Sequence, residues 1–210
     1  MDSKKSSVTA ASKKMYKTVL PRATDLVSDL LAMLASANSP DEVEVFICDA
    51  EDAFWQVLLH PSERRFYCAL LRRPDGTVRY LCFTRTAQGS RGAPLSWATI
   101  FGLVCRCAFS VVRLPGTSDT ERLQVYVDDP AMVVKGTKAF RRNQVTLMML
   151  AWRLLGIALA IKKGQLGPIV DWVGITFPSI AGESLLPYSN LAWTKSANSP
   201  MTSPGGTSPA

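Results

Sequence analysis

The stretch QVYVDDPAMVV, residues 124–134, places two consecutive aspartates between two apolar runs. Runs rich in β-branched residues are typical of strands, and aspartate and proline are typical of the turn between them. The pattern predicts a β-hairpin with Asp128 and Asp129 at its tip. A second stretch, FICDAEDAF at residues 46–54, ends an apolar strand at Asp49. Both stretches therefore place carboxylates where a strand leaves the core.

The two acidic strand ends would meet if their strands were neighbours in one sheet. Adjacent strands lie about 4.8 Å apart, and like charges that close repel each other unless a cation intervenes. Carboxylate oxygens without histidine or cysteine suit Mg²⁺, and two such ions support in-line displacement at a phosphate. The alternative is that Asp128 and Asp129 form an ordinary surface turn, where aspartate is common.

The rest of the chain predicts an α+β fold, one antiparallel sheet backed by helices. Apolar residues at helical spacing predict one helix that begins at Thr24 and two more over residues 94–112 and 139–155. Apolar and β-branched runs predict strands over residues 43–48, 66–71, 78–83, 123–127, 131–134, 157–161 and 170–177. Residues 1–22, which are basic, and residues 191–210, which are rich in Ser, Pro and Gly, are expected to be disordered tails around a domain at 23–190.

The composition indicates a globular protein with a polyanionic partner. Of 210 residues, 47% are hydrophobic and 20% charged, and the net charge is +7. The apolar stretch at residues 145–161 is shorter than the roughly 20 residues of a membrane span and has Arg153 at its centre, so no membrane span is expected. Five cysteines without a CxxC pair and a single histidine argue against zinc. The odd cysteine count and the absence of a signal peptide indicate an intracellular protein.

Five motifs, in order along the chain, resemble those of the reverse transcriptases of retroviruses and retrotransposons. They are VFICDAEDAFWQVLLHP (45–61), TAQGSRGAPLSWA (86–98), YVDD (126–129), LGIALAIKKGQ (155–165) and DWVGITF (171–177). A YxDD motif alone is weak evidence for this family, whereas five matching motifs in the same order are strong evidence. The resemblance covers residues 43–177 and implies a polymerase palm with partial fingers and little or no thumb.

The resemblance implies an RNA-directed DNA polymerase, which adds deoxynucleoside triphosphates to a primer 3′ end on an RNA or DNA template. It implies two Mg²⁺ ions, or Mn²⁺ in their place, held by Asp49, Asp128 and Asp129 beside the main chain of Ala50. Lys162 or Lys163 is implied as the acid for the departing pyrophosphate. The residues implied in nucleotide binding are Ala53, Phe54, Gln88, Gly89 and Lys162. Those implied in holding primer and template are Arg91, Tyr126, Trp172 and Gly174.

Other interpretations stay open. Phe54 and Trp172 also fit a role as core aromatics, and Lys162 and Lys163 fit a solvated pair. For the whole chain the alternative is a catalytically inactive retroelement remnant that at most binds nucleic acid. Only about forty residues precede the first motif, where the family has its basic fingers residues, and little room for a thumb follows residue 177. Another palm enzyme, such as a nucleotidyl cyclase or an RNA-templated RNA polymerase, is disfavoured by the Asp-Ala-Phe and Gln-Gly patterns.

Overall fold

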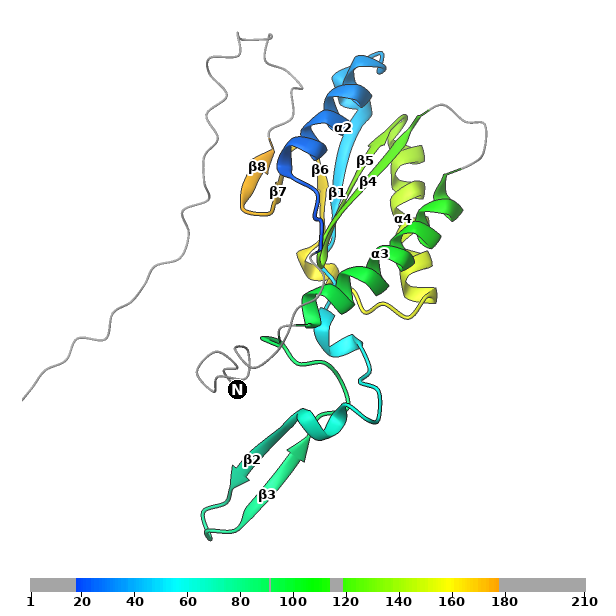
Figure 1. Ribbon diagram of the computed structural model, residues 1–210. Helices are drawn as coiled ribbons and strands as arrows, with labels where there is room; N and C mark the ends of the chain where they lie inside the picture. Colours follow the sequence, from blue (N-terminus) through cyan, green and yellow to red (C-terminus); the bar gives the residue numbers. More distant parts are fainter. Residues whose placement is uncertain (1–17, 91, 114–118, 178–210) are drawn as a thin grey trace, which may run out of the picture.

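The two acidic stretches belong to neighbouring strands of one antiparallel sheet. The computed structural model describes residues 18–90, 92–113 and 119–177. Its main sheet has the strand order β4-β5-β1-β6 (Figure 1). The four strands are β1 (Val43–Ile47), β4 (Glu121–Tyr126), β5 (Asp129–Lys135) and β6 (Gln165–Gly167). The α+β prediction, with an antiparallel sheet packed against helices, is confirmed.

Helices cover the two faces of this sheet unequally. One face carries α3 (Ala93–Val112) and α4 (Lys138–Leu154), and the other carries α2 (Ala23–Ala35) together with a small hairpin (Figure 1). That hairpin consists of β7 (Val170–Trp172) and β8 (Ile175–Phe177). The side-chain alternation of β5 matches this arrangement, because Met132 belongs to the core under α3 and α4 while Val133 belongs to the core under α2. Strand β5 therefore contributes apolar side chains to the cores on both faces of the sheet.

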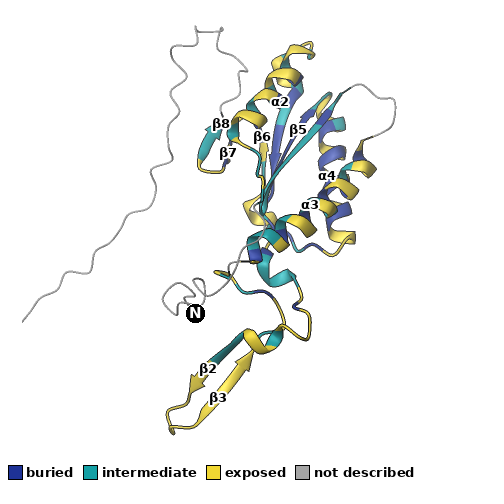
Figure 2. Cartoon of the chain, in the orientation of Figure 1, coloured by how far each residue is buried: buried dark blue, intermediate teal, exposed yellow. Residues whose placement is uncertain are grey.

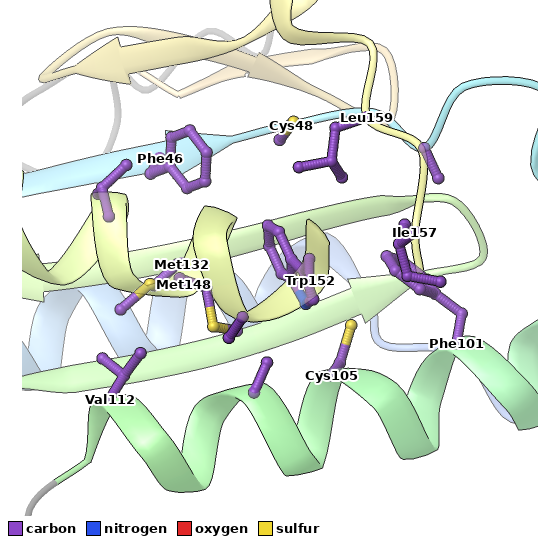
Figure 3. Packing of buried hydrophobic residues seen from close by; sticks show 14 of the residues in the cluster. Phe46, Cys48, Phe101, Cys105, Val112, Met132, Met148, Trp152, Ile157 and Leu159 are labelled. Carbon is purple, nitrogen blue, oxygen red and sulfur yellow. The ribbon is translucent and has the colours of Figure 1, made fainter. Parts of the chain in front are cut away.

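The core between the sheet and helices α3 and α4 is built around aromatic rings. Trp97 stacks on Phe101 with ring centroids 4.9 Å apart, and Trp152 stacks on Phe46 of β1 at 6.4 Å. Figure 3 shows Met132, Met148 and Cys105 filling the space around Trp152. Such close packing fixes the position of β1 and β5 relative to the helices behind them.

Charged side chains tie the far end of the sheet to the helices. Arg141 of α4 is buried and donates a hydrogen bond to Glu44 of β1 at 2.7 Å. On the other face, Asp29 of α2 accepts hydrogen bonds from Arg122 at 3.1 Å and Gln124 at 2.6 Å, both on β4. Buried charges of this kind need such partners, so these contacts fix how each helix lies on the sheet.

A second hairpin extends away from the main sheet. It consists of β2 (Cys68–Arg72) and β3 (Val78–Cys82), which pair only with each other. Figure 2 shows this hairpin as mostly exposed. Four short 3-10 helices complete the described chain, η1 (Pro40–Glu42), η2 (Ala53–Gln56), η3 (Arg64–Phe66) and η4 (Ile161–Lys163).

The predictions for residues 157–177 need correction. The strand predicted over residues 157–161 forms only a single bridge, Leu159 with Ala50, because the chain there runs beside a loop that has already left β1. The strand predicted over residues 170–177 is two strands, since Val173 and Gly174 adopt positive φ in a two-residue turn. Strand β6, which pairs with β1, was not predicted at all.

The bounds of the remaining predicted helices and strands differ by at most two residues from the observed ones. The apolar stretch at residues 145–161 is not one helix, since α4 ends at Leu154 and Gly156 adopts φ +86°. In the described part of the chain, α3 is the one helix long and apolar enough to cross a membrane by length and composition. One face of α3 is buried against the sheet through Trp97 and Phe101, as in the core helix of many soluble folds. The tails predicted at residues 1–22 and 191–210 lie outside the described residues, except for residues 18–22.

Candidate active site

Three aspartates from two neighbouring strands meet at one end of the main sheet. Asp49 directly follows β1, Asp128 lies in the β4–β5 turn, and Asp129 is the first residue of β5. The pairing of β1 with β5 continues past the strand end, because the Ala50 amide donates a hydrogen bond to the Asp128 carbonyl at 3.0 Å. The structure therefore brings together the two acidic strand ends that the sequence placed far apart.

The three aspartates open into a shallow cavity of about 360 Å³. Most of its other walls come from the segment that follows η4. Its full lining is Ile47, Asp49, Asp128, Asp129, Lys163, Gln165, Asp171, Trp172 and Val173. The cavity therefore has four carboxylates and one ammonium group around it, an acidic site of a size suited to small cations and phosphate oxygens.

Burial, together with neighbouring negative charge, raises the pKa of two of these carboxyl groups. Removal from water, together with the charges of Asp128 and Asp49, raises the pKa of Asp129 to about 6. Burial also raises the pKa of Asp128, partly offset by a hydrogen bond from its own backbone, and the charge of Asp49 adds to the increase. Lys163 opposes both increases. The site thus holds more negative charge than its own cation compensates.

Lys163 is the cation that faces these aspartates. Its Nζ donates a hydrogen bond to Asp49 Oδ2 at 2.6 Å, and this bond raises the pKa of Lys163. Lys162, the residue of the pair named for nucleotide binding, is exposed and does not line the cavity. Helix η4 thus directs the second lysine of the pair, and not the first, toward the aspartates.

The donor set fits a hard cation in its chemistry, although its geometry is not that of a preformed cage. In the described residues no group of three or more His, Cys, Asp or Glu side chains is arranged to hold a metal ion. Asp49 instead pairs with Lys163. Carboxylate oxygens are the ligands that Mg²⁺ prefers, and a divalent cation would stabilise the charged forms of Asp128 and Asp129, which burial and neighbouring aspartates disfavour. Asp49 and Asp128 are the residues that would hold it.

Two indole groups fix the turn that carries Asp128 and Asp129. Trp97 Nε1 donates to the Val127 carbonyl at 2.9 Å, and Trp172 Nε1 donates to the Asp129 carbonyl at 2.9 Å. Val127 itself adopts φ +55°, a left-handed conformation that is unfavourable for a β-branched residue. Strained backbone of this kind persists where surrounding contacts enforce it, often at functional sites.

The loop after β1 places the next candidate residues. Ala50 and Ala53 are buried, and Phe54 in η2 is half-buried against the core beneath α3 and α4. Gln56 anchors the loop, because its Nε2 donates to the carbonyls of Glu51 at 2.6 Å and Ala158 at 3.1 Å. Phe54 does not line the cavity, so the structure favours its role in the core and leaves its contact with a sugar untested.

Gln88 and Gly89 of the Gln-Gly loop are not part of the aspartate cavity's lining. Gln88 and Gly89 are exposed in the turn before α3, and Gly89 adopts φ +86°, which favours glycine. Neither residue lines the cavity. Arg91 lies outside the described residues. The described residues of the loop predicted to line the nucleotide pocket therefore contribute no wall to the aspartate cavity.

Of the residues predicted to hold the primer and template, Tyr126 and Trp172 lie next to the aspartates. Trp172 is only 2% exposed, belongs to the core under α2, and contributes its edge to the cavity. Tyr126 contacts Trp172 edge-on, with ring centroids 6.2 Å apart. Gly174 occupies the exposed β7–β8 turn at φ +74°. Trp172 thus has the core role that the sequence left open, and its indole also positions Asp129.

Sequence reasoning did not single out Trp97, Gln56, Gln165 or Asp171. Gln165 Oε1 accepts a hydrogen bond from the Asp171 amide at 2.9 Å, so these two residues join β6 to β7 beside the cavity. The only signal for Trp97 was its place in the motif TAQGSRGAPLSWA, and its hydrogen-bond partner is thirty residues away in sequence. Contacts over such distances are not readable from local patterns.

The chain matches no protein-family model, and a search of the curated proteins finds none similar to it. The resemblance to reverse transcriptases therefore stays a prediction from the motifs, and the geometry of the three aspartates is independent of it.

Proposed function

We propose that the chain is the palm of an RNA-directed DNA polymerase of the reverse-transcriptase type. The observation that carries the proposal is the convergence of Asp49, Asp128 and Asp129, from two adjacent antiparallel strands, on one acidic cavity. The raised pKa of Asp129 supports it, because perturbed carboxyl groups in a cavity are typical of functional sites. The reaction would be attack of a primer 3′-hydroxyl on a deoxynucleoside triphosphate, with release of pyrophosphate.

The protein groups have separable roles in this proposal. Two Mg²⁺ ions held by Asp49 and Asp128 would activate the hydroxyl and neutralise charge on the phosphates. Asp129 adds negative charge beside them. Lys163 is placed to donate a proton to the leaving pyrophosphate, because its ammonium group lines the same cavity. Trp97 and Trp172 act as positioning residues, since each holds a carbonyl of the aspartate turn.

A catalytically inactive remnant that at most binds nucleic acid is the second candidate. The ion pair between Lys163 and Asp49 favours it, because the lysine satisfies a carboxylate that catalysis would need for metal. The cavity lining, which does not include Gln88 or Gly89, also favours it. The net charge of +7 suits nucleic-acid binding in both cases.

Primer extension on an RNA template tests the proposal. Wild-type protein is compared with Asp128→Asn and with a control, Asp52→Asn, which changes an exposed aspartate outside the cavity. Extension with deoxynucleotides and Mg²⁺ that is lost only in Asp128→Asn would support a polymerase. Equal extension by the wild type and Asp128→Asn would refute the assignment of the site. Absence of extension by folded wild-type protein that still binds primer-template would favour the inactive remnant.

A further inference from the structure

The hairpin formed by β2 and β3 has little to hold it besides its own ladder. Its strands pair only with each other, and large apolar residues on it are exposed, Tyr80 by 73% and Leu70 by 56%. Among the described residues, the hairpin is tied to the body at its base, through hydrogen bonds such as that from the Leu59 amide to the Thr84 carbonyl at 2.9 Å. Two-stranded hairpins without further packing are marginally stable in water, so any additional link between the strands would have a large effect.

Two cysteines face each other directly across this hairpin. Cys68 of β2 and Cys82 of β3 are register partners, and the Cys68 thiol donates a hydrogen bond to Cys82 Sγ at 2.8 Å. The hydrogen-bonded rungs are Tyr67 with Phe83 on one side and Arg73 with Thr77 at the turn. Rungs alternate along an antiparallel ladder, so the cysteines occupy a non-hydrogen-bonded pair.

A non-hydrogen-bonded pair has the spacing that a disulfide needs. Its Cα atoms lie about 4.5 Å apart, and Cα separations of about 4.4–6.8 Å are typical of disulfides. The two sulfur atoms are already in contact at 2.8 Å, so bond formation requires only a small further approach of the two side chains. The two cysteines differ in their access to solvent, because Cys82 is exposed while Cys68 is half-buried.

The other three cysteines lack this arrangement. Cys48 and Cys105 are buried in the core, and burial raises the pKa of Cys105 to about 12, so that it stays a thiol. Cys107 is exposed on α3 but has no cysteine opposite it on a neighbouring strand. Cys68 and Cys82 thus differ from the other cysteines because they are register partners and one of them is exposed to solvent. Cys107, which is exposed but has no such partner, provides a matched control.

We propose that Cys68 and Cys82 form a thiol–disulfide site that reacts with small disulfides such as oxidised glutathione. The Cys82 thiolate attacks the small disulfide, forms a mixed disulfide, and releases one small thiol. The Cys68 thiolate then attacks Cys82 Sγ, forms the Cys68–Cys82 bond, and releases the second small thiol. The two cysteines lose two protons and two electrons in total, and the small disulfide is reduced to two thiols. A reducing thiol reverses both steps.

The consequence of oxidation is a more ordered hairpin. The bond would link residues fourteen positions apart, which restricts the open states of the hairpin. The proposal rests on the hairpin alone and does not depend on the polymerase assignment.

The experiment treats folded full-length protein with oxidised glutathione at neutral pH and maps the product by peptide mass spectrometry. The variants are Cys68→Ser, Cys82→Ser and the control Cys107→Ser. The wild type and Cys107→Ser are expected to give a Cys68–Cys82 bond that dithiothreitol removes. Cys68→Ser is expected to stop at glutathione on Cys82. Disulfides that involve Cys107, or a mixed disulfide on Cys82 that never closes in the wild type, would overturn the proposal.

Hydrogen–deuterium exchange on the same samples tests the consequence. Amides of β2 and β3 should exchange at least roughly tenfold more slowly in the oxidised wild type than in the reduced protein. Amides of β1 and β5 should not change. Equal exchange of the hairpin in the two states, with the bond shown to be present, would refute the proposed ordering.

Discussion

Replacing Asp129 by Asn should stabilise the metal-free protein, because it removes one negative charge from a crowded site. Burial and the charges of Asp128 and Asp49 raise the pKa of Asp129 from 3.8 to about 6. At about 1.36 kcal/mol per pKa unit, ionising this carboxyl in the folded protein costs about 3 kcal/mol relative to the unfolded chain. Solvent screening of a partly exposed group reduces the expected gain for Asp129→Asn to about 1–2 kcal/mol at pH 8.

The sign of the pH dependence follows from proton binding. Between pH 3.8 and about 6 the folded state holds more protons on Asp129 than the unfolded state does. The free energy of unfolding of the wild type should therefore fall as pH rises through that window. Asp129→Asn lacks the titrating group and should lack this part of the decrease. The difference between the two proteins should be small at pH 4 and largest above pH 7.

Urea unfolding in the presence of a chelator, at pH values from 4 to 8, measures this difference. The control is Asp52→Asn, since Asp52 is exposed and its left-handed backbone conformation is one that asparagine also adopts. Added Mg²⁺ should stabilise the wild type and so reduce the difference in the free energy of unfolding between the two proteins. If Asp129→Asn is no more stable than the wild type at pH 8, the ionised Asp129 carboxylate does not destabilise the folded protein.

Three further outcomes are expected. Lys163→Met should tighten Mn²⁺ or Mg²⁺ binding roughly two- to fivefold, because the ion pair with Asp49 at 2.6 Å no longer competes with the metal. Calorimetry measures this affinity, and unchanged or weaker binding would contradict the expectation. Trp97→Phe should lower the free energy of unfolding by about 1–3 kcal/mol, since the Val127 carbonyl loses its donor, and a variant as stable as wild type would show the bond to be unimportant. If the polymerase proposal holds, Phe54→Ala should reduce discrimination against ribonucleotides roughly 10- to 100-fold in single-nucleotide extension, whereas unchanged discrimination would leave Phe54 with only a core role.

The fold was largely predictable because the strands that carry the aspartates are dominated by local pattern. The β-branched runs on both sides of Asp128 and the apolar run before Asp49 predict strands whatever surrounds them. Strand β6 was not predictable in the same way. Its three residues, Gln165–Gly167, have no strand signal of their own and become a strand because the edge of β1 is available to pair with them. Whether such a short segment forms a strand thus depends on its tertiary contacts more than on its own sequence.

The same limit applies to the candidate site. Its acidic centre could be predicted because Asp49 and Asp128 follow strong strand signals. Which lysine faces them could not, because Lys162 and Lys163 are adjacent in sequence and the orientation of η4 decides between them. The position of Gln88 and Gly89 relative to the cavity could not be predicted from the sequence either. A motif that is continuous in sequence gives no distance to a cavity assembled from other segments.

The two tryptophans that hold the aspartate turn have a consequence for how this site can change. Trp97 and Trp172 bind main-chain carbonyl groups on either side of Asp128, and neither bond uses a carboxylate. These two bonds therefore do not depend on the identity of the acidic side chains. Substitution of an aspartate in this turn should therefore leave both of these hydrogen bonds in place.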